Sequence, residues 1–567
     1  MKKYLIFVLL LLTSNLSFAF VFSAVCETGQ TLYYEIIEDT NRVEIVAPNS
    51  FYIGYEKPTG DIILPSTVEY DGQTYTVVGI SGGAFEYCSD LTGPLVIPST
   101  IETIGYYAFY MCSGLSGALV LNEGLTEIGS NAFYGCSGLT GELVLPQTLR
   151  WICDDAFAEC SGFTGDLVIP NNVSSLGSYA FVRCTGFDGH LTLSESLYGI
   201  ENGTFYKCSG LTGDLVIPDA VTRIENNAFG YCSGFDGELV LPESLSYISQ
   251  GAFRGCSGLK GELHLPESLR YVNTSAFENC SGFTGSLHLP PRMTSVSAYA
   301  FRGCSGFTGD LVFPETMQTI GSYSFCNCPG LSGKIVFPAG LNRIEQFAFD
   351  SCGVFTEMIV QSIVPPDAEA DAFAGLPADL PVHVNCGCAD YYRIMPQWKN
   401  FTNYFEDFIF SFSVRADVPE FGNVVCSHAP DCDDNRAVME AFPAQGQRFY
   451  FWTKNGEVVS LNLRLVVTVD GNADFVAHFS ETSVDETESC RFSVFPNPAS
   501  EKFTVEGENL GRIDLYDMTG KKVKTVSAGS KSNCVSVDAE ELDKGIYCVC
   551  VISENGKQVA VKKVVID

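Results

Sequence analysis

The sequence predicts a β-rich solenoid followed by two small β-domains. The first observation is a period of 24 residues that repeats twelve times without insertion or deletion. The second is a cysteine three residues after the phenylalanine of every copy, and the third is a change to short alternating segments once the period stops. A fixed period of this length is typical of solenoids, because one coil cannot bury its own apolar face and must stack on its neighbours. The phenylalanines are Phe85, Phe109, Phe133, Phe157, Phe181, Phe205, Phe229, Phe253, Phe277, Phe301, Phe325 and Phe349.

One repeat indicates the course of its own coil. The segment Leu143–Pro146 predicts a short strand with Val144 pointing outward, and the proline ends that strand because it lacks an N–H donor. Leu149 and Ile152 predict a second extended leg, and Ala156–Cys160 predicts a short helical corner. We expect the strands to form one long parallel sheet over interior ladders of phenylalanine, cysteine and leucine.

The repeat resembles the leucine-rich repeats of BspA-type bacterial surface proteins. The pattern that carries the resemblance is Ala-Phe-x-x-Cys-Ser-x-Leu followed by Leu-x-Ile-Pro-x-x-Leu-x-x-Ile, over residues 83–355, about half of the chain. The resemblance implies a leucine-rich-repeat solenoid displayed on a cell surface for adhesion or interaction. The period alone implies only a solenoid.

The segments around the repeat predict an exported protein with capped ends. Residues 1–19 read as a signal peptide, because two lysines precede an apolar run that is too short to span a bilayer. No other segment approaches transmembrane length. Residues 20–82 predict an N-terminal cap with a hairpin at Asp71-Gly72. The net charge of −34 makes nucleic acid and anionic membranes poor partners.

The residues after the repeat predict a second cap and then a spacer-like module. Residues 356–407 are expected to close the solenoid with a last strand at Leu380–Val384 and a helix at Ala389–Trp398. Residues 408–480 resemble the divergent internalin B-repeat modules of bacterial surface proteins, which are small β-domains. Residues 481–490 are acidic and predict a linker.

Residues 491–567 contain seven short strand-like segments, which suffice for a β-sandwich. Their motifs resemble the C-terminal sorting domain of type IX secretion, and the residues that carry the resemblance include Pro496, Asn497, Pro498, Gly520, Gly545 and Tyr547. The resemblance implies transport across the periplasm and outer membrane by the type IX machinery. It also implies removal of this domain and attachment of the protein to surface lipopolysaccharide.

The 23 cysteines form two groups. The twelve ladder cysteines are predicted to be free, close-packed apolar groups inside the coils, although neighbours lie within disulfide reach. Outside the ladder, Cys426 and Cys432 are candidates for a bridge, whereas Cys386 and Cys388 are too close together to pair without strain.

The outward face of the predicted strands is the candidate binding site, and we name it the acid–valine face. Stacking places its members in rows about 4.8 Å apart from coil to coil. Two interpretations stay open: a solvated sheet face, or a surface for a basic or apolar partner. The histidines beside Glu262 lack a third ligand, so no metal and no cofactor is predicted. The face consists of Glu142, Asp166, Asp214, Glu238, Glu262, Val144, Val168, Val216, Val240, His264 and His288.

These observations predict a surface binding or adhesion protein with a protein or glycan partner. A structural spacer and an unrecognised secreted hydrolase are the alternatives. The sequence has no H-E-x-x-H motif and no clear nucleophile set, so it predicts no enzyme.

Overall fold

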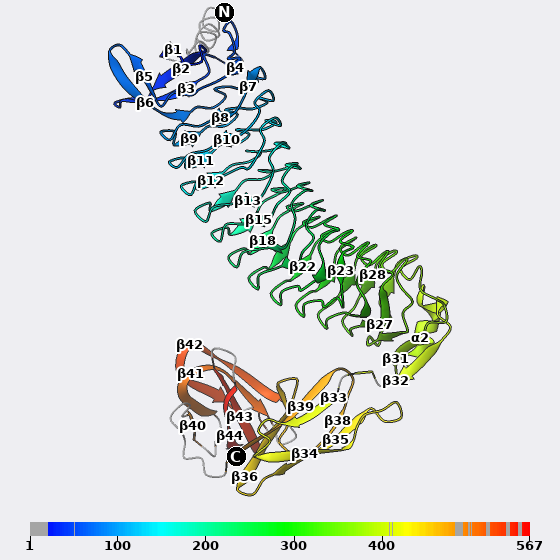
Figure 1. Cartoon of the computed structure of the whole chain (residues 1–567). Coiled ribbons are helices and arrows are strands. Elements are labelled where there is room, and N and C mark those ends of the chain that lie inside the picture. Colours follow the sequence, from blue (N-terminus) through cyan, green and yellow to red (C-terminus); the bar gives the residue numbers. More distant parts are fainter. Residues whose placement is uncertain are drawn as a thin grey trace, which may run out of the picture. The chain divides into compact units, whose positions relative to one another are not determined.

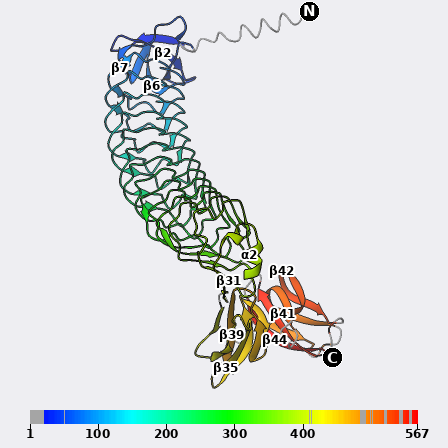
Figure 2. The same ribbon diagram turned by 90° about the vertical axis from the view of Figure 1, so that its right-hand side faces the viewer.

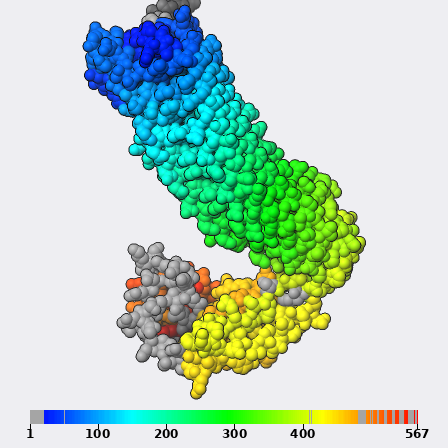
Figure 3. Space-filling model, viewed as in Figure 1, coloured from blue at the N-terminus to red at the C-terminus, as the bar shows by residue number. Residues whose placement is uncertain are grey.

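The structure is a computed structural model that describes residues 21–49, 52–407, 409–410, 412–481, 492–496, 499, 502–516, 522–539, 542, 545–553 and 558–566. The chain divides into two units, Met1–His383 with Asp390–Phe405 and Val384–Ala389 with Glu406–Asp567. The predicted signal peptide and almost all of the predicted linker lie outside the described residues. In the first unit the coils stack in one curved row (Figures 1 and 2), and their outer surface is continuous from cap to cap (Figure 3).

The second leg of each coil carries the longer of two parallel ladders. The strand order is β1-β2-β3-β6-β9-β11-β12-β14 in one sheet, with β5 on β6, and β16-β18-β20-β22-β24-β26-β28-β30 in the next. The bounds in the first sheet are β1 Phe22–Val25, β2 Thr31–Ile36, β3 Arg42–Val46, β5 Thr67–Tyr70, β6 Gln73–Ile80, β9 Thr103–Ile104, β11 Glu127–Ile128, β12 Trp151–Ile152 and β14 Ser175–Leu176. Those in the second are β16 Gly199–Ile200, β18 Arg223–Ile224, β20 Tyr247–Ile248, β22 Tyr271–Val272, β24 Ser295–Val296, β26 Thr319–Ile320, β28 Arg343–Ile344 and β30 Asp367–Ala368.

The first leg forms only short parallel pairs until the last coils, so the prediction of one long sheet is wrong. The pairs are β4 (Gly60–Asp61) with β7 (Leu91–Thr92), β8 (Leu95–Val96) with β10 (Leu119–Val120), β13 (Leu167–Val168) with β15 (Leu191–Thr192), β17 (Leu215–Val216) with β19 (Leu239–Val240), and β21 (Gly261–Glu262) with β23 (Phe283–Thr284). A five-stranded sheet then contains β25 (Gly309–Val312), β27 (Leu331–Phe337), β29 (Glu357–Val360), β31 (Val382–Asn385) and β32 (Tyr404–Asp407). Most first-leg segments are confined between a glycine in the left-handed region, such as Gly165 at φ 78°, and the following proline.

The corner of each coil is a chain of tight turns rather than the predicted helix. Asp155 and Glu159 both adopt positive φ, 55° and 60°, on either side of Phe157. As a result alternate N–H groups point at the next coil: Asp155 donates to the carbonyl of Ser178, and Phe157 to that of Ala180, both at about 2.8–2.9 Å. A helix would direct these donors along its own axis, so the corner exchanges local hydrogen bonds for bonds between coils.

Phenylalanine and cysteine ladders fill the interior as predicted. Phe229 is 0% exposed and stacks on Phe205 and Phe253, with ring centroids 5.3 and 5.6 Å apart. Each thiol from Cys112 to Cys352 donates to the carbonyl of the phenylalanine 27 residues earlier at 3.0–3.2 Å, as Cys232 does to Phe205. The ladder cysteines are free in the structure, which confirms that prediction.

A hairpin lies at the N-terminal end of the repeat and a short helix at its C-terminal end. β5 and β6 pair as an antiparallel hairpin through Tyr70 and Gln73, with Asp71 and Gly72 at positive φ in the turn. At the other end, α2 (Ala389–Ile394) ends before Pro396 and is followed by η2 (Trp398–Asn400). Trp398 is buried, and its indole N–H donates to the carbonyl of Pro366 at 2.8 Å.

The middle module of the second unit contains two sheets. The orders are β33-β39-β36-β37 and β34-β35-β38. The bounds are β33 Phe412–Ala416, β34 Gly422–His428, β35 Arg436–Pro443, β36 Gln447–Lys454, β37 Glu457–Ser460, β38 Arg464–Thr468 and β39 Ala473–Glu481. A disulfide joins Cys386 to Cys432, so the suggested Cys426–Cys432 bridge is wrong. The thiol of Cys426 instead donates to the carbonyl of His428 at 3.1 Å.

The C-terminal domain has five described strands in one sheet rather than seven in a sandwich. They are β40 (Phe492–Phe495), β41 (Lys502–Tyr516), β42 (Lys522–Asp538), β43 (Gly545–Ser553) and β44 (Gln558–Ile566), in the order β40-β41-β43-β44 with β42 on β41. Predicted strand pairs merge into β41 and β42 because register shifts let each long strand continue past an irregularity. Cys550 is buried and packs with Tyr516 against Val458 of the middle module, which explains an apolar residue on the outer side of β43.

Candidate binding faces of the solenoid

The predicted valine row is exposed and in register. Parallel pairing aligns Val96 with Val120 and Val216 with Val240, so successive side chains stack along the coils. Their exposed fractions lie between 39% and 65%. The exposed members of the row are Val96, Val120, Val144, Val168, Val216, Val240 and Val312.

The aspartates and glutamates of this face make different contacts, because their side chains differ in length. Asp166 accepts the backbone N–H of His190 at 2.7 Å, and Asp214 accepts that of Glu238 at 2.8 Å. The aspartates therefore help to hold one coil on the next. The longer side chains of Glu142, Glu238 and Glu262 are exposed on the same face and reach past this backbone contact.

The histidines lie on the same face but do not assemble a metal site. The ring of His264 is 4.0 Å from the carboxylate of Glu262, and both side chains are largely exposed, so the contact is weak. His288 instead lines an open hollow of about 820 Å³ with Asp310, Val312 and Phe313. In the part of the chain that the structure describes, no group of three His, Cys, Asp or Glu side chains could hold a metal.

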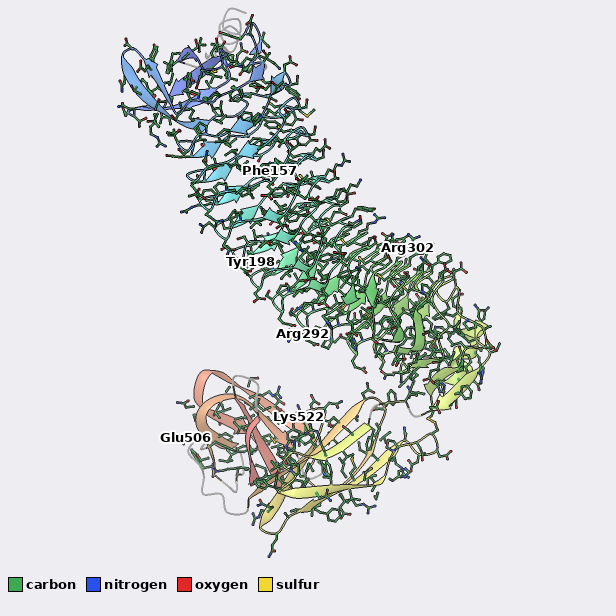
Figure 4. The ribbon with its side chains drawn as sticks, in the orientation of Figure 1. Phe157, Tyr198, Arg292, Arg302, Glu506 and Lys522 are labelled. Atoms are coloured by element: carbon green, nitrogen blue, oxygen red, sulfur yellow. A yellow bond between two sulfur atoms is a disulfide. The ribbon has the colours of Figure 1, made fainter. Side chains whose placement is uncertain are left out.

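A second face was missed in the sequence, and we name it the aromatic–arginine strip. It follows the two outward positions of the second leg, between the buried residues of each coil. Exposed aromatic rings stand there at Trp151 (44%), Tyr198 (62%), Tyr247 (39%) and Tyr271 (45%). The sequence signal that would have revealed these rings is an alignment of all coils, read down these two outward positions. The strip consists of Arg150, Trp151, Tyr198, Arg223, Tyr247, Arg270 and Tyr271 of these columns together with Arg292, which lies two residues before the first column, and Figure 4 shows Tyr198 and Arg292 on one edge of the solenoid.

The strip is electrostatically unusual for so acidic a chain. Its two columns contain no Asp or Glu from Arg150 to Ser295. Arg223 lies over the ring of Tyr198 at 5.7 Å and pairs with Glu201 at 2.7 Å and Glu225 at 3.1 Å, which lie just outside the columns. Arg223 thus orients Tyr198.

Three other arginines keep their charge available. Among the described residues, no carboxylate lies within the 4.0 Å of an ion pair from the guanidinium groups of Arg150, Arg270 and Arg292. All three side chains are exposed. They therefore leave their hydrogen-bond donors to solvent or a ligand.

The arginines of the corner are, by contrast, already paired. Arg254 and Arg302 both contact the buried carboxylate of Glu278, at 3.0 and 3.1 Å. Arg183 contacts Glu159 at 2.9 Å. Figure 4 shows Arg302 on the edge opposite Tyr198, so the corner is a separate surface with little free positive charge.

One constellation imitates a catalytic triad. In the middle module, His478 Nδ1 lies 3.0 Å from Asp417 and its Nε2 lies 3.0 Å from the hydroxyl of Thr453. Thr453 is only 4% exposed, so its hydroxyl is shielded from a substrate. The chain of hydrogen bonds connects β36, β39 and the segment after β33, which is a structural role.

The sorting-motif residues are placed only in part. Gly545 begins β43 opposite Ile566, and Tyr547 is buried in the same strand. Pro496 follows β40 and is exposed. Asn497, Pro498 and Gly520 lie outside the described residues. No helix of the described part is long and apolar enough to cross a membrane.

Comparison with family models agrees with the BspA-type repeat and sorting-domain resemblances. The BspA type leucine rich repeat region matches in six copies over residues 78–212, 164–284 and 222–355. The secretion system C-terminal sorting domain matches residues 493–567. No curated protein matches the chain.

Several solved structures are similar to the solenoid. A leucine-rich repeat protein from Bacteroides ovatus is 24% identical with a TM-score of 0.48, over 66% of this chain and 98% of that chain. A leucine rich cell surface protein from Faecalibacterium prausnitzii is 18% identical with a TM-score of 0.37, over 63% and 98%. The leucine rich repeat protein of T. pallidum is 28% identical with a TM-score of 0.30, over 40% and 87%.

The family models, the coil geometry and the C-terminal sheet lead to one identification. Residues 78–355 are a BspA-type leucine-rich repeat region, and residues 493–567 are a type IX sorting domain that marks the chain for secretion to the cell surface.

Proposed function

We propose that the protein is a cell-surface adhesin whose solenoid binds a protein or glycan partner. The observation that carries the proposal is the row of exposed valines on the acid–valine face. From Val96 to Val312 the row crosses nine coil steps, about 43 Å at about 4.8 Å each. A face of that length needs a width of only about 19 Å to reach the roughly 800 Å² per partner of a standard interface.

The chemistry of the face favours a partner that is apolar in the centre and basic at the rim. Exposed valines supply apolar area, and Glu142, Glu238 and Glu262 supply negative charge beside it. The open hollow beside His288 adds a concave region to the same face. Charge there acts mainly on the association rate, whereas the valines act on residence time.

The sorting domain supports a location of this binding activity at the cell surface. We propose that the domain is removed after transport and that the mature protein is held at lipopolysaccharide, with the solenoid displayed outward. Under the alternative of a structural spacer, the same display would occur without a ligand. A secreted hydrolase is less well supported, because the hydroxyl of Thr453 in the triad-like group of the middle module is buried.

The test compares attachment of cells that display altered full-length chains. Glu142→Lys with Glu238→Lys reverses charge without removing the aspartates that join the coils, and Val144→Ser with Val240→Ser removes apolar area. Glu38→Lys with Glu69→Lys is the matched control, because it makes the same charge change at exposed positions of the N-terminal segment, outside the repeated coils.

The readout is attachment to an array of immobilised extracellular matrix proteins and glycans, at low and high salt. We expect the two face variants to reduce attachment and the control to retain it, with the charge effect larger at low salt. Equal attachment by all variants, and by cells that lack the protein, would favour the spacer.

A further inference from the structure

Within the aromatic–arginine strip only Arg223 has a printed ion pair that joins one coil to the next, through Glu201. The side chains of Trp151, Tyr198, Tyr247 and Tyr271 make no hydrogen bond in the part of the chain that the structure describes, and each leaves between 39% and 62% of its surface exposed. Exposed aromatic rings beside unpaired arginines are costly to leave bare and are enriched where proteins bind ligands.

We propose that this strip binds a linear polysaccharide that carries carboxylate or sulfate groups, laid along the solenoid axis. The proposal deepens the proposed function, on which it rests, by naming a second surface and its ligand class. The spacing of the rings is the first argument. Trp151 and Tyr198 are two coils apart, as are Tyr198 and Tyr247, which gives a step of about 10 Å along the solenoid axis from one ring to the next at about 4.8 Å for each coil, with Tyr198 in the neighbouring column.

This spacing matches the length of an extended disaccharide, so alternate sugars of one chain can each lie on a ring. The apolar C–H face of a sugar packs on an aromatic face, and the electron-rich ring attracts those polarised hydrogens. Arg223 and Glu201 fix the Tyr198 ring in advance, because the guanidinium lies over the ring and is itself held by the carboxylate at 2.7 Å. Such preorganisation lowers the entropy lost on binding.

Charge is the second argument. Arg150, Arg270 and Arg292 project from the strip without a carboxylate partner, and planar guanidinium groups form two parallel hydrogen bonds with carboxylate or sulfate. The strip is thus a positive line on a chain of net charge −34. A neutral glycan would leave these three charges without a partner.

Width is the third argument and favours a polymer over a globular partner. Rows of acids border the strip, with Glu195, Asp219, Glu243 and Glu267 on one side and Glu201 and Glu225 on the other. From the coil of Trp151 to the coil of Ser295 the strip is about 29 Å long, so an interface of roughly 800 Å² would need a width of about 28 Å. Such an interface must cover both acid rows, whereas a chain one sugar wide lies between them.

The experiment measures binding of the purified full-length protein to three soluble probes. Heparin carries sulfate and carboxylate, polygalacturonate carries carboxylate alone, and cellohexaose is linear and uncharged. The variants are Trp151→Ala with Tyr247→Ala, and Arg150→Gln with Arg270→Gln. The matched control is Tyr106→Ala with Tyr179→Ala, which truncates exposed aromatic rings that lie outside the strip and outside the acid–valine face.

We expect at least one charged probe to bind and cellohexaose to bind at least about tenfold more weakly. Each strip variant should weaken the charged probe by at least about fivefold, and the control should not. Raising salt from 50 to 200 mM should weaken the wild type more than the arginine variant. Whichever charged probe binds distinguishes sulfate from carboxylate recognition.

Three results would overturn the proposal: no binding of either charged probe, equal binding of charged and neutral probes, or equal losses in strip and control variants. Because all altered side chains are exposed, unfolding temperatures should be unchanged, and this measurement accompanies each variant. Attachment of cells through the acid–valine face does not depend on these residues. Failure here with attachment intact therefore removes the polysaccharide ligand and leaves the proposed function standing.

Discussion

Replacing Phe229 with alanine tests whether the solenoid is stabilised coil by coil. The ring is 0% exposed and stacks on one ring above and one below. Phe→Ala in a core costs about 3–5 kcal/mol, and each aromatic pair accounts for about 0.5–1.5 kcal/mol of such totals. We therefore expect local opening to become easier by about 4 kcal/mol, which is about a thousandfold in the opening equilibrium.

Hydrogen exchange of single amides measures where this cost falls. The amides of Phe205 and Phe229 donate across successive corners to Ala228 and Ala252, so their protection reports the affected coils. The amides of Phe109 and Phe325 make the same bonds to Ala132 and Ala348 several coils away. Nearest-neighbour stacking predicts a large loss at the first pair and little at the second.

A matched variant separates ring stacking from volume. Phe229→Leu keeps most of the apolar volume but loses both ring contacts, so we expect about a third of the alanine effect. The reasoning fails if Phe229→Ala lowers protection equally from Phe109 to Phe325. That result would mean that the coils unfold as a single cooperative unit.

The remaining predictions concern thiols, the disulfide and sorting. Burial raises the pKa of the Cys136 and Cys208 thiols to about 12, against about 8.5 for free cysteine, so the folded state holds these protons longer. The free energy of unfolding should stay constant below about pH 8.5, and above that pH it should fall by about 1.4 kcal/mol per pH unit for each such thiol. A denaturant midpoint that does not change from pH 8 to 10 would contradict this prediction. Changing Cys386 and Cys432 to serine removes a bridge across 46 residues and should destabilise the second unit by about 4 kcal/mol in urea titration. Deleting residues 491–567 should leave the chain in the periplasm, and normal surface labelling of the deletion strain would refute its role in sorting.

The features of the fold that recur in every coil could be predicted from the sequence period. Column spacing placed Phe229 and Cys232 inside, and the Asp71-Gly72 turn predicted the hairpin of the first cap. These features depend on residue type at fixed intervals, so one chain suffices to find them.

The parts that depended on contacts between coils were harder to predict. A corner with apolar residues at Ala156 and Phe157 suits a helical turn equally well, and only the next coil decides where its N–H groups bond. The Cys386–Cys432 pair was missed because 46 residues separate its members and only the folded module brings them together. The aromatic–arginine strip was missed because its rings occupy two columns and skip coils.

Contacts between coils also determine which outward side chains hold the coils together and which do not. On the first leg, Asp166 and Asp214 accept backbone N–H groups of the next coil, so stacking itself constrains which residues can stand there. On the second leg the backbone ladder is more complete, because β16 to β30 pair without interruption. Side chains such as Tyr247 and Tyr271 are then released from holding coils together. The outward positions of the second leg are therefore free to carry binding residues such as Tyr247 and Arg270.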